Sequence, residues 1–159
     1  MEFRIDRRAA CLLLAAALLP LGAAAAAAPE HASRDEARAM VDAAVAHVRQ
    51  VGPQQAWKDF TDKSNAAWHR KDLYVFAYAT DGTCVAHGVN DRLVGKNLLD
   101  MKDVDGKPLI RELRDTAAKG GGWVDYQWPD PLTKKVEAKT SYVRRTDNFD
   151  GFVGAGVYR

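Results

Sequence analysis

The segment at residues 72–80 constrains the fold of this chain most, because a strand there would be apolar on both faces. Side chains alternate along a strand, which separates an aliphatic group from an aromatic one. These are Leu73, Val75 and Ala77 on one face, and Tyr74, Phe76 and Tyr78 on the other. A strand with two apolar faces is covered on both sides. The sequence therefore predicts a sheet strand with a layer against each face.

Four further segments predict the rest of the sheet. Asp81-Gly82 is the turn signal of a tight hairpin, and the returning strand is expected at residues 83–87. Three more strands are expected at residues 123–128, 136–144 and 151–158. Hairpin-linked strands form antiparallel sheets, so we expect an α+β fold in which a long helix covers one face.

Three helices are predicted outside the strands. Residues 34–51 carry an apolar stripe at the i, i+3, i+4, i+7 spacing, and Ser33 with Glu36 forms a capping box before it. A short helix is expected at residues 54–62, and a third helix from Pro108 to Lys119 ends at three glycines. Residues 88–107 remain as a long irregular connection, a type of loop that is usually functional.

The first 28 residues are expected to be a secretory signal rather than part of the fold. Arg4, Arg7 and Arg8 precede an apolar stretch, and small residues follow, with cleavage expected at Ala26 to Ala28. If uncleaved, residues 9–28 are just long enough to anchor the chain in a bilayer. A twin-arginine signal or a lipid on Cys11 fits less well. One domain at residues 34–159 is expected to follow.

Charge and cysteine content exclude several classes of protein. Removing residues 1–28 leaves a net charge of about +1, so no field of one sign exists to bind nucleic acid or an anionic membrane. Cys84 is then the only cysteine and forms no internal disulfide. The core is therefore expected to be held by packing alone, which a chain of this length permits.

Catalytic and metal-binding patterns are weak. Cys84 and His87 are three residues apart on a strand, so regular alternation places them on opposite faces and excludes a nucleophile–base dyad. His31, His47 and His69 are scattered and have no metal-ligand spacing. We expect no catalysis, no cofactor and no metal.

The segment from Met101 to Glu112 partly resembles a calcium-binding loop. Asp103, Asp105, Gly106 and Glu112 match four positions of an EF-hand loop, but Met101 stands at its first position. A helix is expected inside the segment, and Asp105 is better explained by turn and helix-start chemistry.

The order of several short motifs resembles the single Cache domain over about residues 35–159. The motifs include Leu73 to Tyr78, Asp81-Gly-Thr, Ala86-His87, Val94 to Asp100, Asp105-Gly106, Ile110 to Leu113, Gly120 to Val124, Tyr126-x-Trp-Pro129, Lys139 to Val143 and Gly154 to Tyr158. The resemblance implies a PAS-like fold with a five- or six-stranded antiparallel sheet, a long N-terminal helix and a ligand pocket. It also implies an extracytoplasmic sensing role in chemoreceptors or sensor kinases, with small organic acids as ligands.

Candidate ligand-binding residues lie on the predicted strands, because a small-molecule pocket is apolar and aromatic with a few polar groups. They are Tyr74, Phe76, Tyr78, His87, Trp123, Tyr126, Trp128, Lys139 and Tyr142. Lys139 would hold a ligand carboxylate, although a surface position is the alternative. Regular alternation puts Lys139 and Tyr142, and likewise Trp123 and Tyr126, on opposite faces. The loop at residues 88–107 would form a lid, with Asn90, Arg92 and Lys96 near the ligand.

Two functions remain open at this point. The first is an exported sensor module that binds a small carboxylate in the periplasm or outside the cell. The second is an interaction module without a small ligand, which docks onto a membrane receptor or sensor kinase or forms a homodimer through its N-terminal helix. The second is considered because family members are commonly followed by a membrane helix and a signalling module, whereas this sequence ends at Arg159.

Overall fold

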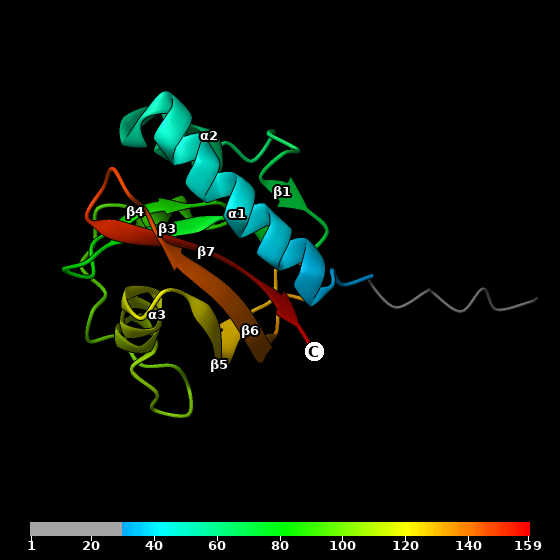
Figure 1. The fold of residues 1–159 in the computed structure, drawn as a ribbon. Coiled ribbons are helices and arrows are strands. Elements are labelled where there is room, and N and C mark those ends of the chain that lie inside the picture. Colours follow the sequence, from blue (N-terminus) through cyan, green and yellow to red (C-terminus); the bar gives the residue numbers. More distant parts are fainter. Residues whose placement is uncertain (1–29) are drawn as a thin grey trace, which may run out of the picture.

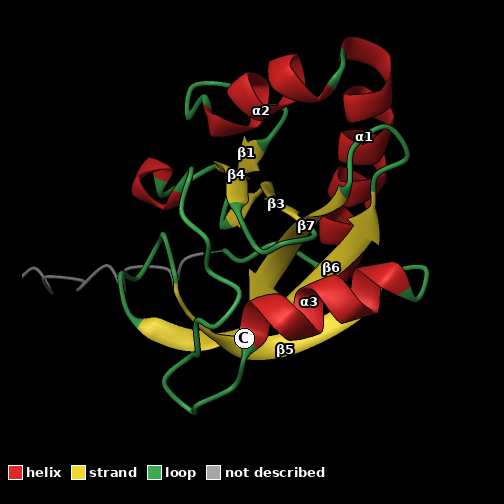
Figure 2. Cartoon of the chain, turned by 90° about the vertical axis from the view of Figure 1, so that its left-hand side faces the viewer, coloured by secondary structure: helices red, strands yellow, loops and turns green. Residues whose placement is uncertain are grey.

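The computed structural model describes residues 30–159, and the predicted secretory segment lies outside them. Five strands form an antiparallel sheet in the order β4-β3-β7-β6-β5. Their bounds are β3 Phe76–Ala79, β4 Cys84–His87, β5 Gly122–Pro129, β6 Val136–Arg145 and β7 Gly151–Tyr158. Helix α1 (Arg34–Val51) crosses one face of the sheet and α3 (Leu109–Ala118) lies on the other, as Figures 1 and 2 show. The predicted α+β fold with a long N-terminal helix is confirmed.

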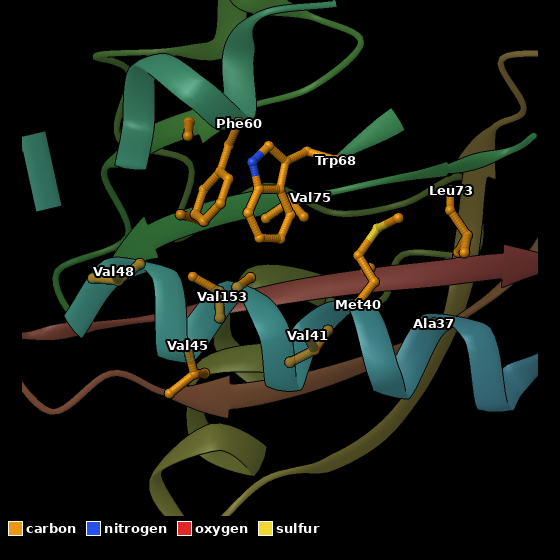
Figure 3. Close-up of a cluster of buried hydrophobic side chains, with 14 of the residues drawn as sticks. Ala37, Met40, Val41, Val45, Val48, Phe60, Trp68, Leu73, Val75 and Val153 are labelled. Carbon is orange, nitrogen blue, oxygen red and sulfur yellow. The ribbon is translucent and has the colours of Figure 1, made fainter. Parts of the chain in front are cut away.

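Helix α1 begins as its sequence predicts. Ser33 accepts a hydrogen bond from the backbone of Glu36, and the Glu36 carboxylate accepts one from the backbone of Ser33. The helix packs its apolar stripe on the sheet and on α2 (Pro53–Thr61), as Figure 3 shows. The buried stripe consists of Ala37, Met40, Val41, Ala44, Val45 and Val48. Burial of this stripe is what stabilises the helix, because propensity alone contributes little.

The strand predicted at residues 72–80 is divided in two. Leu73–Tyr74 is β2 and pairs with β1 (His69–Arg70) in a separate two-stranded sheet, whereas β3 begins at Phe76. Trp68, just before β1, is buried and meets Phe60 of α2 edge-on at 4.8 Å between ring centroids. This contact fixes the short β1 hairpin beside α2.

The long connection at residues 88–107 follows the outer edge of β4. A 3-10 helix, η1 (Asp91–Leu93), begins it, and the backbone N–H groups of Cys84 and Leu98 then donate to Lys96 and Gly82. The connection therefore covers an otherwise unpaired strand edge.

No helix within residues 30–159 is both long enough and apolar enough to cross a membrane.

Candidate functional site

A small cavity lies between the sheet and α3. It is lined by Tyr74, Phe76, Tyr78, His87, Leu109, Ile110, Leu113, Tyr126 and Trp128. Its free space is about 10 Å³, which is room for about one water molecule. A larger ligand therefore needs side chains of this wall to move.

Strand alternation explains why these side chains converge. Tyr74, Phe76 and Tyr78 differ by two positions, as do Tyr126 and Trp128, so each group points to the α3 side. All were predicted from the sequence as pocket residues, and the structure brings them together with His87 around the one cavity.

Two glycines of β7 make space for the aromatic rings. A Cβ at Gly154 would lie 2.4 Å from the ring of Phe76, and one at Gly156 would lie 2.0 Å from Oγ of Ser141. Ser141 uses the space at Gly156 to hydrogen-bond the hydroxyl of Tyr126 at 2.8 Å. The glycines therefore let side chains from β3 and β6 lie directly on the β7 backbone.

Trp123 and Tyr142 do not belong to this cavity, which corrects their assignment to the ligand site. Both pack against the core on the α1 side, with ring centroids 5.2 Å apart. The guanidinium groups of Arg34 and Arg38 cover them, 4.2 Å from the Trp123 ring and 5.4 Å from the Tyr142 ring. The strands are regular here, so residues offset by an odd number from Tyr126 and Lys139 face the other way.

Lys139 is buried on the α3 side of β6, at 1% exposure. Its ammonium lies 3.9 Å from the centre of the Tyr74 ring and 3.3 Å from the hydroxyl oxygen of Tyr158. It forms no salt bridge within residues 30–159. Burial lowers its pKa to about 7, although the buried carboxylates of Asp72 and Asp130 act on it from a longer distance in the opposite direction. The alternative of a surface lysine is therefore wrong. Lys139 does not itself line the cavity, but the Tyr74 ring against it does.

The hydroxyl of Tyr158 is held by a second bond. It donates to the carbonyl of Pro129 at 2.7 Å and therefore presents its lone pairs to the ammonium of Lys139. An ammonium has three donors, and the hydrogen bond to Tyr158 uses one of them. The contact with the Tyr74 ring adds a cation–π attraction. Lys139 thus keeps hydrogen-bonding capacity at the edge of the aromatic cluster.

His87 is buried at the end of β4 and stays uncharged. The backbone N–H of Asn90 donates to its Nδ1 at 3.1 Å, so the ring proton resides on Nε2. Burial lowers the pKa of His87 to about 3, and the nearby charge of Lys139 acts in the same direction. A neutral imidazole of this tautomer is a hydrogen-bond donor at the cavity wall.

An outer pocket of about 510 Å³ lies beyond His87 and Trp128. These two side chains line both spaces, and Lys63 and Lys134 lie on the outer pocket. His87 and Trp128 therefore form the wall between the inner cavity and a solvent-connected space, and a ligand passing from one to the other has to displace them.

The cover of the cavity is α3 rather than the loop at residues 88–107. Leu109, Ile110 and Leu113 close it from this helix, and none of them was among the ligand-binding residues expected from the sequence. The loop contributes Leu93, Leu98 and Met101 to the surrounding core. Arg92 and Lys96, which were expected near a ligand, are exposed, whereas Asn90 lies on the outer pocket.

Cys84 and His87 lie on the same side of the sheet, contrary to the alternation argument. A bulge at Val85 shifts the register between β3 and β4, so Cys84 joins the α3-side core. The thiol donates to the carbonyl of Ala86, and burial raises its pKa to about 11. It is therefore a packed thiol with no thiolate character near neutral pH.

Asp103, part of the calcium-like pattern, has a structural role. Its carboxylate accepts hydrogen bonds from the backbone N–H groups of Asp105, Lys107 and Gln127. It closes the turn before α3 and ties it to β5, in agreement with the turn chemistry expected for this segment.

Several solved structures share this architecture. A methyl-accepting chemotaxis protein from Vibrio parahaemolyticus is 27% identical, with a TM-score of 0.70, covering 78% of this chain and 86% of that one. A Cache chemosensory domain, solved for its recognition of carboxylic acids, is 25% identical, with a TM-score of 0.65, covering 78% of this chain and 91% of that one. A periplasmic sensor domain of a chemotaxis protein is 26% identical with a TM-score of 0.60, covering 78% and 88%.

A curated relative and a family model agree with these structures. The sensor histidine kinase MctS of Rhizobium johnstonii is 41% identical over 88 residues, which are 55% of this chain and 19% of the kinase. The chain therefore corresponds to about a fifth of that relative's length. The model for Single Cache domain 2 matches residues 24–159. Domains of this kind are extracytoplasmic sensory domains of chemoreceptors and histidine kinases. The chain belongs to the Single Cache domain 2 family.

Proposed function

We propose that this domain binds a short-chain monocarboxylate in the cavity beneath α3, without chemical conversion of the ligand. The observation that carries the proposal is the buried ammonium of Lys139, which has no carboxylate partner within residues 30–159. A buried charge without a counter-ion is costly. A ligand carboxylate that reaches this ammonium would supply the direct charge-assisted hydrogen bond that the more distant Asp72 and Asp130 do not make.

The surroundings of Lys139 favour a single carboxylate with a small apolar tail. The cavity wall is aromatic and aliphatic, and Lys139 is its one neighbouring cation among the described residues. A second carboxylate would have to be buried against Phe76 and Leu113 without a partner, at a cost of several kcal/mol. The small free volume favours a short chain.

Neutral donors would complete the recognition of the carboxylate. The rings of His87 and Tyr74 line the same cavity with centroids 5.0 Å apart, and the Tyr74 hydroxyl, now 3.4 Å from that of Tyr158, would turn toward the ligand together with Nε2 of His87. Rotation of the Tyr74 ring would bring the ammonium of Lys139 and the cavity into contact. Binding by rearrangement of a few side chains is common in sites of this kind.

The domain would act as the sensory part of a signalling system outside the cytoplasm. The relatives are a histidine kinase and chemotaxis proteins, and the recognition of a carboxylic acid by one solved Cache domain supports the choice of ligand. We propose that the exported domain passes its ligand state to a membrane receptor or sensor kinase. Docking or homodimer formation through α1 is the alternative function.

Isothermal titration with acetate, propionate, butyrate, succinate and propylamine tests the proposed ligand class. We expect saturable binding of at least one of the three monocarboxylates and none of propylamine. Lys139→Met should weaken that binding by at least about 30-fold, since loss of one partner of a buried charge pair costs about 2 kcal/mol or more.

Lys135→Met is the matched control, because Lys135 lies just before β6 and its side chain is exposed. It should bind the ligand as the wild type does. Equal affinity of the Lys139 and Lys135 variants, or no binding of any monocarboxylate by the wild type, contradicts the proposal. Light scattering of the same samples tests the alternative of self-association.

A further inference from the structure

His31, Asp130 and Glu137 converge at the end of the sheet where the chain enters α1. One ligand atom of each residue, an imidazole nitrogen or a carboxylate oxygen, lies within 4.8 Å of the others. They come from three separate segments, which are the stretch before α1, the turn after β5 and the start of β6. Their spacing along the chain matches no metal-binding pattern, so only folding brings them together.

Each of the three side chains is already held by a partner that leaves one atom free. Nδ1 of His31 lies 3.2 Å from the Asp72 carboxylate, which in turn accepts bonds from the backbone N–H groups of Ala32 and Tyr158. In the neutral imidazole, an Nδ1 proton donated to Asp72 leaves the lone pair of Nε2 directed toward Asp130. A carboxylate behind a histidine is the usual support of a metal-bound imidazole.

The two carboxylates are oriented in the same way. Oδ1 of Asp130 accepts the backbone N–H of Leu132 at 2.7 Å, and Oε1 of Glu137 accepts the hydroxyl of Thr133 at 2.8 Å. The other oxygen of Asp130, Oδ2, is buried and has no hydrogen-bond partner within residues 30–159, and Asp130 itself is 1% exposed. A buried carboxylate oxygen without a partner costs free energy.

That oxygen faces the imidazole. Oδ2 of Asp130 lies 3.7 Å from Nε2 of His31, which is longer than an N–H···O hydrogen bond of about 2.7–3.2 Å. With the proton on Nδ1, the two atoms are both electron-pair donors, and a cation between them satisfies both. His31 is partly exposed, with 27% of its side chain open to solvent, so an ion has a route to this position.

We propose that His31, Asp130 and Glu137 bind a divalent transition-metal ion of the Zn²⁺ type. One imidazole and two carboxylates form a ligand set that zinc accepts, with ligand atoms about 2.0–2.2 Å from the ion. Glu137 is half-buried, so its side chain has room to move its carboxylate to this distance from the ion. Hard cations such as Ca²⁺ and Mg²⁺ prefer oxygen ligands alone, so the imidazole selects against them.

The bound ion would fasten the segment before α1 to the turn between β5 and β6. Asp130 also lines the outer pocket, and the carbonyl of the preceding Pro129 holds the hydroxyl of Tyr158. The metal would therefore fix one wall of the route to the inner cavity. This role does not depend on the identity of the ligand bound there.

Untagged protein purified after export and treated with a chelator tests the proposal by competition titration with Zn²⁺ alone. The expected result is one ion bound per chain and a higher thermal midpoint in its presence. His31→Gln, Asp130→Asn and Glu137→Gln should each lower the affinity at least tenfold. Asp130→Asn retains Oδ1 for Leu132, and Glu137→Gln, at a half-buried position, provides a variant with little effect on folding.

His47→Gln is the matched control, because Nε2 of His47 lies 2.7 Å from the Asp59 carboxylate in a pair without a third ligand. It should bind Zn²⁺ as the wild type does. Absence of saturable binding, an equal loss in the His47 variant, or tighter binding of Ca²⁺ than of Zn²⁺ overturns the proposal. In the first case His31 and Asp130 form an ion pair or share a water molecule instead.

Discussion

The two faces of the sheet carry cores of different chemistry. On the α1 side the buried cluster consists of Ala, Val, Leu, Met, Phe and Trp side chains, as Figure 3 shows. On the α3 side the buried side chains include the ammonium of Lys139, the imidazole of His87 and several tyrosine hydroxyls. Successive residues of the same strands supply both cores, so the difference comes from alternation alone.

This difference separates stability from binding within one small domain. Packing of aliphatic side chains stabilises the fold without needing polar partners. Buried polar groups stabilise it only when they are paired, and Lys139 forms no salt bridge with a carboxylate among the described residues, with Asp72 and Asp130 acting on it only from a longer distance. We infer that the core on the α1 side provides most of the stability of the fold. The core on the α3 side keeps polar groups that lower stability but can recognise a ligand.

The largest effect is expected from a cavity on the α1 side. Phe60 is fully buried and contacts Trp68 and His47. Phe60→Ala should lower the free energy of unfolding by about 3–5 kcal/mol, measured by urea denaturation, while the folded fraction keeps its ligand affinity. A loss below about 1 kcal/mol would contradict the assignment of the main stabilising core to this side.

A smaller effect is expected from acid on the α3 side. His87 has a pKa of about 3 in the folded protein and about 6.5 in the unfolded chain. Its contribution to stability is therefore complete above pH 6.5 and is lost as the pH falls from 6.5 toward 3. Between pH 7 and pH 4 the wild type should lose about 3 kcal/mol more than His87→Asn, which keeps an acceptor for Asn90.

The control for this comparison is His47→Asn, since His47 is partly exposed. That variant should retain the acid sensitivity of the wild type. Parallel pH profiles of unfolding free energy for the wild type and His87→Asn would show that His87 is charged in the folded state.

The smallest effect has the opposite sign. Lys139→Met replaces a buried ammonium that forms no salt bridge by an apolar side chain of similar length, and should raise the free energy of unfolding by about 1–2 kcal/mol. The same variant is expected to lose ligand binding. Destabilisation in urea denaturation would mean that Lys139 supports the fold, and the contrast between the two faces would then be weaker than we infer.

The feature of the site that the sequence predicted best is the face of the sheet on which each side chain lies, because side chains alternate along a strand. Tyr74, Phe76 and Tyr78 could be placed on one face from the sequence, and their common cavity is found there. Trp123 and Tyr142 were kept among the candidates, although regular alternation separated them from Tyr126 and Lys139. Where the two arguments disagreed, the geometry of a regular strand gave the correct placement.

Features that depend on contacts between distant segments could not be predicted in the same way. The β1–β2 hairpin is too short to produce a period, and it is held by the burial of Trp68 against Phe60. The bulge at Val85 cannot be recognised from the order of residues, so the prediction that Cys84 and His87 lie on opposite faces was wrong. The spacing of His31 along the chain matches no metal-binding motif, so the sequence does not predict that folding places its imidazole beside the carboxylate of Asp130.

The glycines of β7 have a mechanical consequence. The ring of Phe76 rests on the backbone at Gly154, and the adjoining residues Val153 and Ala155 pack on the α1 side. A ligand that displaces this ring therefore moves the β7 backbone directly, and the side chains of Val153 and Ala155 pass the displacement to α1. Such coupling works equally in both directions. A receptor that binds α1 would change the affinity of the cavity for its ligand by the same factor by which the ligand changes the affinity of α1 for the receptor.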